Sequence, residues 1–241
     1  KKAGKLPIIF ADKDSWTIHQ GWDAIDMSSR GSQDDFFQNV LNGDAFLYED
    51  SIALDSTRKF LEIRKYGQKQ TVNTGYDEAV KKFANGEAYM FFQGNWAYPM
   101  IKKINPDIDL LFMPFPAYHE NQAKVVVKID ATLGVSASCK HLEAVEQFLD
   151  YVFSKNVSEY YADKAGAYSC IKSVDVEDSY AKAFTDSIRS GEFFLEEFAY
   201  ETEKSDAINA LFQNFISSPQ RDTEKSFLKE LNDLLIQQKG D

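Results

Sequence analysis

Apolar residues recur along the chain in two spacings, one typical of short buried strands and the other typical of amphipathic helices. Dense apolar runs predict strands at 6–10, 87–93, 108–113 and 124–128. Apolar positions three and four residues apart predict helices at 16–27, 36–41, 51–66, 76–84, 96–103 and 142–153. Beyond residue 173 the pattern is almost wholly helical, which predicts helices around Phe184, Phe212 and Leu231. This order predicts an α/β fold, a mixed sheet covered by helices with a helical C-terminal part.

Glycines and asparagines mark the turns between these elements. Asn85-Gly86 follows one predicted helix and supplies a residue that adopts left-handed backbone angles at low cost. Gly94-Asn95 follows the predicted strand at 87–93 and starts the next helix. The apolar residues of that strand are continuous rather than alternating, which predicts burial on both faces.

The balance of charge argues against an anionic macromolecule as the partner. The chain has 241 residues and a formal net charge of −11, and this field repels nucleic acid and anionic lipid. The charge also suits a soluble monomer, which is our expectation. Cys139 and Cys170 show no zinc-ligand spacing. We therefore expect no metal and no cofactor, and a disulfide between the two cysteines is the less favoured alternative.

Motifs of several common enzyme classes are missing from the sequence. It contains no Gly-x-Ser-x-Gly elbow, no phosphate-binding loop, no Gly-x-Gly-x-x-Gly and no His-Glu-x-x-His. Acidic residues are plentiful, so a hydrolase that uses paired carboxylates remains an alternative. We expect a binding protein rather than an enzyme.

The most specific stretch runs from Phe83 to Trp96. It holds Phe-x-x-Gly at the end of a helix, then x-Ala-x-Met on a strand, then Gly-x-Trp. This stretch resembles the signature of the family 1 extracellular solute-binding proteins, the group that includes the maltose-binding protein. Three later segments resemble the family in the same order: Pro114-Phe115-Pro116, the run from Asp130 to Ser138, and Ala165 to Tyr168.

The resemblance implies a type II periplasmic-binding-protein-like architecture of two lobes joined by crossovers. Lys1 to Phe10 then resembles the point just after the first crossover, so that most of the N-terminal lobe would lie outside this sequence. Residues 1–128 and 173–241 would form the C-terminal lobe, and residues 129–172 would belong to the N-terminal lobe. Without that lobe, the apolar stripe of the helix at 142–153 would stay partly uncovered.

Candidate ligand-binding residues gather around the motif. The resemblance places Trp96 beside the cleft at the start of a helix, where an indole face and free backbone N–H groups suit a sugar. Asn95 could bind a sugar hydroxyl or could serve only the turn. Tyr98 could line the same wall or pack in the core.

Other candidates come from segments that border the cleft in the family. Asp14 could accept hydrogen bonds from sugar hydroxyls and Trp16 could stack on a sugar ring; their alternative is an N-cap aspartate and a helix-anchoring tryptophan. Asp130 lies on a crossover and could reach the ligand or satisfy hinge backbone. Tyr200 precedes the helix that begins near Lys204, an approach that borders the cleft in the family, and could line it.

The function implied is the extracytoplasmic substrate-binding component of an ABC transporter. It would capture a mono- or oligosaccharide between the lobes and deliver it to a membrane permease. The protein would be lipid-anchored at the cell surface or periplasmic. A non-sugar solute, such as a polyamine or a peptide, remains the alternative ligand.

Overall fold

The computed structural model describes residues 6–30, 35–115, 124–129, 132–174, 182–196, 202–218 and 223–236. The first half of the chain contains β1 (Leu6–Ile9), α1 (Trp16–Ser28), α2 (Phe36–Asn42), α3 (Ser51–Arg64), the short 3-10 helix Thr71–Asn73, α4 (Tyr76–Ala84), β2 (Ala88–Phe91) and α5 (Ala97–Ile104). The second half contains β3 (Val125–Lys128), α6 (Leu142–Val152), α7 (Lys155–Ala165), α8 (Lys182–Ser190), β4 (Phe193–Glu196), α9 (Thr202–Ser217) and α10 (Glu224–Ile236).

The described strands form two parallel pairs. β1 pairs with β2 in the register Leu6↔Ala88, and β3 pairs with β4 in the register Val125↔Phe193. Helix α4 packs against the first pair, and α1 and α8 contact the second. Parallel pairing needs a crossover between the strands, and here helices supply it.

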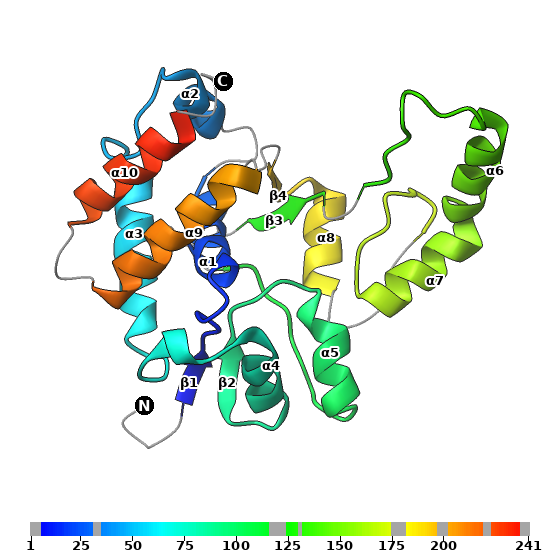
Figure 1. Ribbon diagram of the computed structural model, residues 1–241. Coiled ribbons are helices and arrows are strands. Elements are labelled where there is room, and N and C mark those ends of the chain that lie inside the picture. The colour runs from blue at the N-terminus through cyan, green and yellow to red at the C-terminus, as the bar shows by residue number, and fades with distance from the viewer. Residues whose placement is uncertain are drawn as a thin grey trace.

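The main hydrophobic core lies among α1, α3, α9 and α10, which lie together on the left of Figure 1. Trp22, Phe60, Phe212 and Phe227 are fully buried there. Trp22 Nε1 donates to Thr57 Oγ1 over 2.9 Å, so its only polar atom is satisfied. The C-terminal helices α9 and α10, in the part predicted to be helical, therefore pack against α1 in one core.

Helices α6 and α7 form an arm, residues 132–174, that projects from the rest of the molecule (Figure 1). No residue of α6 is buried. Its apolar side chains include Phe148, which is 55% exposed, and Leu142 and Tyr151 are also exposed. The uncovered stripe predicted for the helix at 142–153 is thus confirmed.

Two strand predictions need correction. Tyr89 and Met90, predicted to be buried, are 68% and 52% exposed because β2 lies in a sheet of only two described strands. The predicted strand at 108–113 is not formed: Lys102 Nζ, rather than a neighbouring strand, binds the carbonyl of Ile108 at 2.8 Å. Leu111 in that segment is 77% exposed.

The side chain of Gln68 takes the place of a neighbouring strand beside Phe10. Its Oε1 accepts from the backbone N–H of Phe10 at 3.1 Å, and its Nε2 donates to the carbonyl of Phe10 at 2.5 Å. One amide therefore satisfies both backbone groups at the residue that follows β1.

A buried ion network ties α1 to α3. Arg30 Nε donates to Asp26 Oδ2 at 2.5 Å, and Arg30 Nη2 donates to Asp50 Oδ1 at 2.6 Å. Asp50 also caps α3 by accepting from the N–H of Ala53 at 2.7 Å. Burial raises the pKa of Asp26, and Arg30 opposes that rise.

Replacing Arg30 by methionine should destabilise the protein by about 3–5 kcal/mol, since it leaves the Asp26 carboxylate buried without its cation. Urea unfolding measures the change. The matched control is Arg58→Met, which breaks an exposed pair with Asp55 and should cost less than about 1 kcal/mol. Equal effects of the two substitutions would contradict this account of the network.

Candidate functional site

Three helix N-termini bring aromatic side chains together. Trp16 opens α1, Tyr76 opens α4, and Trp96 immediately precedes α5. The ring centroids of Trp16 and Trp96 lie 6.3 Å apart at 51°, and those of Trp16 and Tyr76 lie 5.3 Å apart at 55°. We call these three residues the aromatic cluster. All three side chains are only partly buried.

The turn before α5 explains the position of Trp96. A Cβ atom on Gly94 would lie 2.1 Å from the Trp96 ring, so only glycine lets the indole lie against this backbone. The first turn of α5 is closed by Ala97 N–H donating to Gly94 O at 3.2 Å. The Gly-x-Trp spacing therefore fixes the direction of the ring.

Several polar atoms in the described residues are buried without a hydrogen-bond partner. They include the N–H of the Trp96 ring and the hydroxyl of Tyr76, and the others are Gln20 Oε1 and Gln93 Nε2. Burial raises the pKa of Tyr76 to about 12, with a further contribution from the charge of Asp77. The Trp96 indole opposes this rise, although its N–H and the Tyr76 hydroxyl do not meet hydrogen-bond geometry. These two polar groups are thus enclosed at the cluster without a partner, an arrangement that costs free energy until a partner is supplied.

Asp14 binds the N-terminus of α4. Its Oδ2 accepts from the N–H of Tyr76 at 2.6 Å, where the carboxylate also meets the positive end of the helix dipole. Asp12, the other acidic residue of this loop, is buried and paired with Arg64. The loop therefore places Asp14 beside the aromatic cluster and commits Asp12 to the core.

The remaining predicted residues lie at different places. Asn95 Nδ2 donates to Gly166 O at 2.6 Å, across 71 positions of the chain. The Tyr98 ring is partly buried and lies 6.1 Å from the ring of Phe112. Asp130 and Tyr200 lie outside the described residues.

Two residues at the site were not among the sequence candidates: Lys128, which lies beside the cluster, and Tyr76, which belongs to it. Lys128 Nζ lies 5.8 Å from the centroid of the Trp96 ring, within the range of a cation–π contact. Lys128 ends strand β3, and polar residues at the carboxyl ends of parallel strands commonly face ligands. The position of Lys128 at the end of the predicted strand at 124–128 was therefore the sequence signal that could have identified it.

His19, one turn after Trp16, is a neutral neighbour of the site. Its Nδ1 lies 2.7 Å from Asn209 Oδ1, and its Nε2 lies 4.0 Å from Asp23 Oδ2. Burial lowers the pKa of His19 to about 4; the hydrogen bond to Asn209 opposes this shift, and the charge of Lys128 adds to it. His19 is therefore uncharged near neutral pH.

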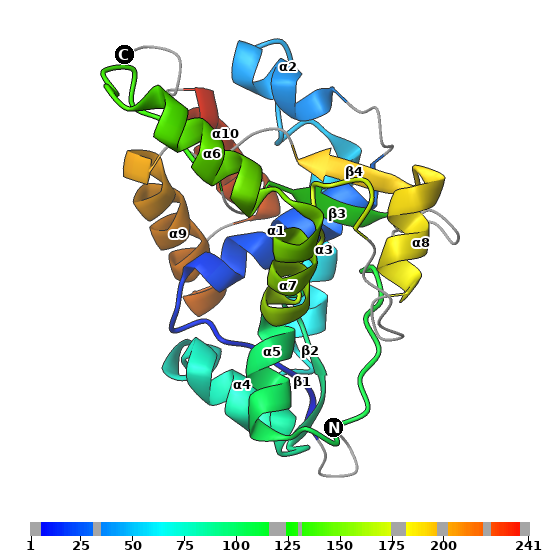
Figure 2. The ribbon, with the colours of Figure 1, turned by 90° about the vertical axis from the view of Figure 1, so that its right-hand side faces the viewer.

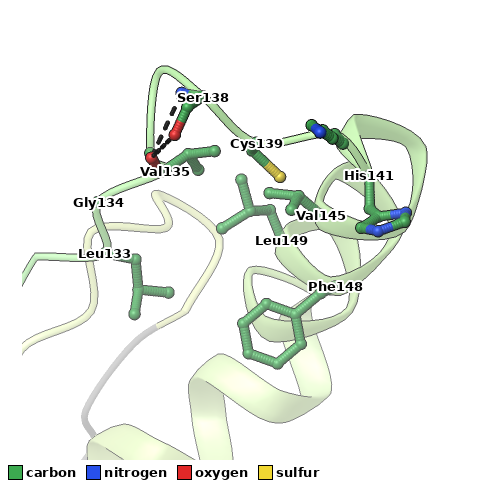
Figure 3. Close-up of a pocket in the computed structure, with 11 residues that line it drawn as sticks. Leu133, Gly134, Val135, Ser138, Cys139, His141, Val145, Phe148 and Leu149 are labelled. Atoms are coloured by element: carbon green, nitrogen blue, oxygen red, sulfur yellow. Dashed lines mark hydrogen bonds between the residues drawn. The ribbon is translucent and has the colours of Figure 1, made fainter.

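Two cavities lie away from the aromatic cluster. One of about 750 Å³ lies between the end of α3 and α9, with Arg64 and Ile216 in its wall. The other, of about 550 Å³, lies in the arm (Figure 3), where Phe148 and Leu149 of α6 face the loop that carries Leu133. Both are grooves in the surface rather than an extension of the aromatic cluster.

The described residues offer no metal-binding group of histidine, cysteine and acidic side chains. Cys139 and Cys170 are free thiols in the structure. None of the described helices combines the length and the apolar character needed to span a bilayer.

Comparisons with known proteins define the class. The solved structures of SBP RafE in complex with raffinose (21% identity, TM-score 0.74) and of a Bacillus licheniformis sugar transporter in complex with stachyose (18% identity, TM-score 0.74) share the fold. The matches include 99% and 97% of this chain, and this chain covers 62% of the length of each solved structure. The chain thus has the predicted α/β, type II periplasmic-binding-protein-like fold.

Sequence comparison gives the family. A family model described as "Bacterial extracellular solute-binding protein" matches residues 2–158, and the chain belongs to that family, whose members act outside the cytoplasm. A "Multiple sugar-binding protein" of Streptococcus mutans is 28% identical over 182 residues, which are 72% of this chain. The match covers 42% of that relative, so the chain spans less than half of its length.

The buried neutral His19 predicts a loss of stability in mild acid. The unfolded histidine binds a proton near pH 6.5 and the folded one only near 4, so its contribution is complete above about pH 6.5 and is lost as the pH falls towards 4. Between about pH 7.5 and about pH 4.5 the free energy of unfolding should fall by about 2 kcal/mol more than in His19→Gln. Urea unfolding at both pH values measures this, with the exposed His141→Gln as control. A wild-type loss equal to that of His19→Gln would contradict the assignment.

Proposed function

We propose that the full protein is the substrate-binding component of an ABC transporter that captures a mono- or oligosaccharide and delivers it to a membrane permease. The observation that carries the proposal is the Trp16–Trp96 pair, with buried polar atoms beside it that lack partners. The C–H faces of sugars pack on aromatic rings, and their hydroxyls bind hydrogen-bond donors and acceptors beside those rings. No bond is broken in this function, so the protein is not an enzyme.

The relatives support a carbohydrate as the solute. The two solved structures with this fold hold raffinose and stachyose, and the curated relative is described as a multiple sugar-binding protein. Asp14 and Lys128 would add charge-assisted hydrogen bonds at the edge of the aromatic cluster. The protein would act as a monomer, either lipid-anchored at the cell surface or in the periplasm.

We assign residues 1–128 and 173–241 to a C-terminal lobe and residues 129–172 to an N-terminal lobe that continues outside this sequence. Two observations support this division. Helix α6 has no buried residue, and the chain covers 62% of the length of the solved structures that it matches. The sugar would lie between the lobes, and closure by a hinge motion would bury it.

Replacing Trp96 by alanine in the full-length protein should weaken sugar binding by about 1–3 kcal/mol, because a stacking face is lost, while the unfolding midpoint stays nearly constant. Isothermal titration calorimetry with a panel of mono- and oligosaccharides measures the affinity. Trp22→Phe is the control: that indole is buried in the core, so stability should fall and affinity should hold. Spermidine or a short peptide binding in place of every sugar would assign a different solute class.

Replacing Phe148 by aspartate tests the lobe division. In the full-length protein this change should lower the free energy of unfolding by about 2–4 kcal/mol, because it places a charge where Phe148 would pack against the rest of the N-terminal lobe. In residues 1–241 alone it should change stability little, since Phe148 is exposed there. Urea unfolding of both lengths measures the difference, with the exposed Glu146→Asp as control. A small effect in both lengths would count against the assignment of residues 129–172.

A further inference from the structure

The arm contacts the rest of the molecule at the turn that directly precedes Trp96. Figures 1 and 2 both show the α7 end of the arm beside α5. At that point Asn95 Nδ2 donates to the carbonyl of Gly166, the residue that ends α7, at 2.6 Å. Asn95 directly precedes Trp96, so the contact joins the arm to the turn that positions the indole.

Glycine is the only residue type that fits at position 166 without strain. Its φ is +62°, and a Cβ atom there would lie 3.2 Å from the Pro99 ring and 3.4 Å from Asn95 O. The left-handed backbone strains any other residue, and a Cβ atom would also require the Pro99 ring to shift by a few tenths of an ångström. Gly166 is itself buried, although the helix that it ends is largely exposed.

The turn transmits this contact to the indole through its own backbone. Asn95 O accepts from the N–H of Tyr98 at 3.0 Å, which fixes the first turn of α5 in the orientation that Asn95 takes. Gly94, on the other side of Asn95, carries the Trp96 ring against its backbone. A shift of Asn95 therefore moves Trp96.

We propose that Asn95 and Gly166 form a joint that sets the arm relative to the turn bearing Trp96, so that sugar binding and arm orientation are coupled. Asn95 is then a positioning residue rather than a direct ligand contact. The coupling rests on the proposed function, whereas the joint itself does not. Any ligand that holds Trp96 in one position also narrows the range of arm orientations.

The joint is tested in the full-length protein without any sugar. Spin labels at Lys155→Cys in the arm and Lys65→Cys on α3, with Cys139 and Cys170 replaced by serine, report the distance between the two parts by pulsed electron resonance. Gly166→Ala and Asn95→Ala should each broaden or shift the distance distribution. Gly86→Ala is the control, because its φ is +76° but nothing lies within 4 Å of an added Cβ. Unchanged distributions in both joint variants would overturn the proposal.

The coupling is tested by calorimetry with raffinose, stachyose and their component monosaccharides. Gly166→Ala should lower affinity by about tenfold, and Gly86→Ala by less than twofold. A moved distance distribution with unchanged affinity would reject the coupling and keep the joint. If the wild-type protein binds none of a broad sugar panel, the proposed function fails, and the sugar-free distances still decide the joint.

Discussion

The loop between β1 and α1 is held by two carboxylates that face opposite ways, and the geometry of the site depends on them. Asp12 is buried against Arg64 of α3, while Asp14 binds the first N–H of α4 through Tyr76. Trp16 follows two residues later and begins α1. Because the loop is fastened on both sides, the ring of Trp16 is held 5.3 Å from that of Tyr76 and 6.3 Å from that of Trp96, measured between ring centroids.

The arm shows the same amphipathic helical pattern as the core but a different outcome. In the core, the stripes of α1, α9 and α10 cover one another, so that Phe212 and Phe227 meet edge to face with 5.0 Å between ring centroids. In the arm, α6 packs against α7, and Phe148 remains 55% exposed. Each such side chain forgoes about 1.5–3 kcal/mol of burial free energy. Patches of this kind usually mark surfaces that meet another part of a protein.

Local signals in the sequence predicted most elements, whereas contacts between distant segments could not be read from it. Gly86 follows its helix where expected, and Gly43 and Gly191 follow other helices in the same way, each with a left-handed φ. The burial of β2 and the strand at 108–113 were mispredicted because they depend on how many strands lie alongside, which no local pattern encodes. An apolar run is equally compatible with a covered sheet and with an open edge.

The same limit applies to the site. The motif around Trp96 identified it as a candidate, but only the fold shows that Trp16, eighty positions earlier, faces it. Tyr76 was missed because an aromatic residue at a helix start is ordinary in sequence. Asn95 illustrates the converse: its type suits a sugar hydroxyl, yet its amide is used by Gly166.

The amide of Gln68 has a consequence for the ageing of the protein. It offers Phe10 a donor and an acceptor at once, and only an uncharged amide can do both. Slow hydrolysis of that amide to a carboxylate would release ammonia, remove the donor and set a negative charge against the Phe10 carbonyl. A single deamidation would therefore loosen the end of β1, next to the loop that orients the aromatic cluster, without any change in the encoded sequence.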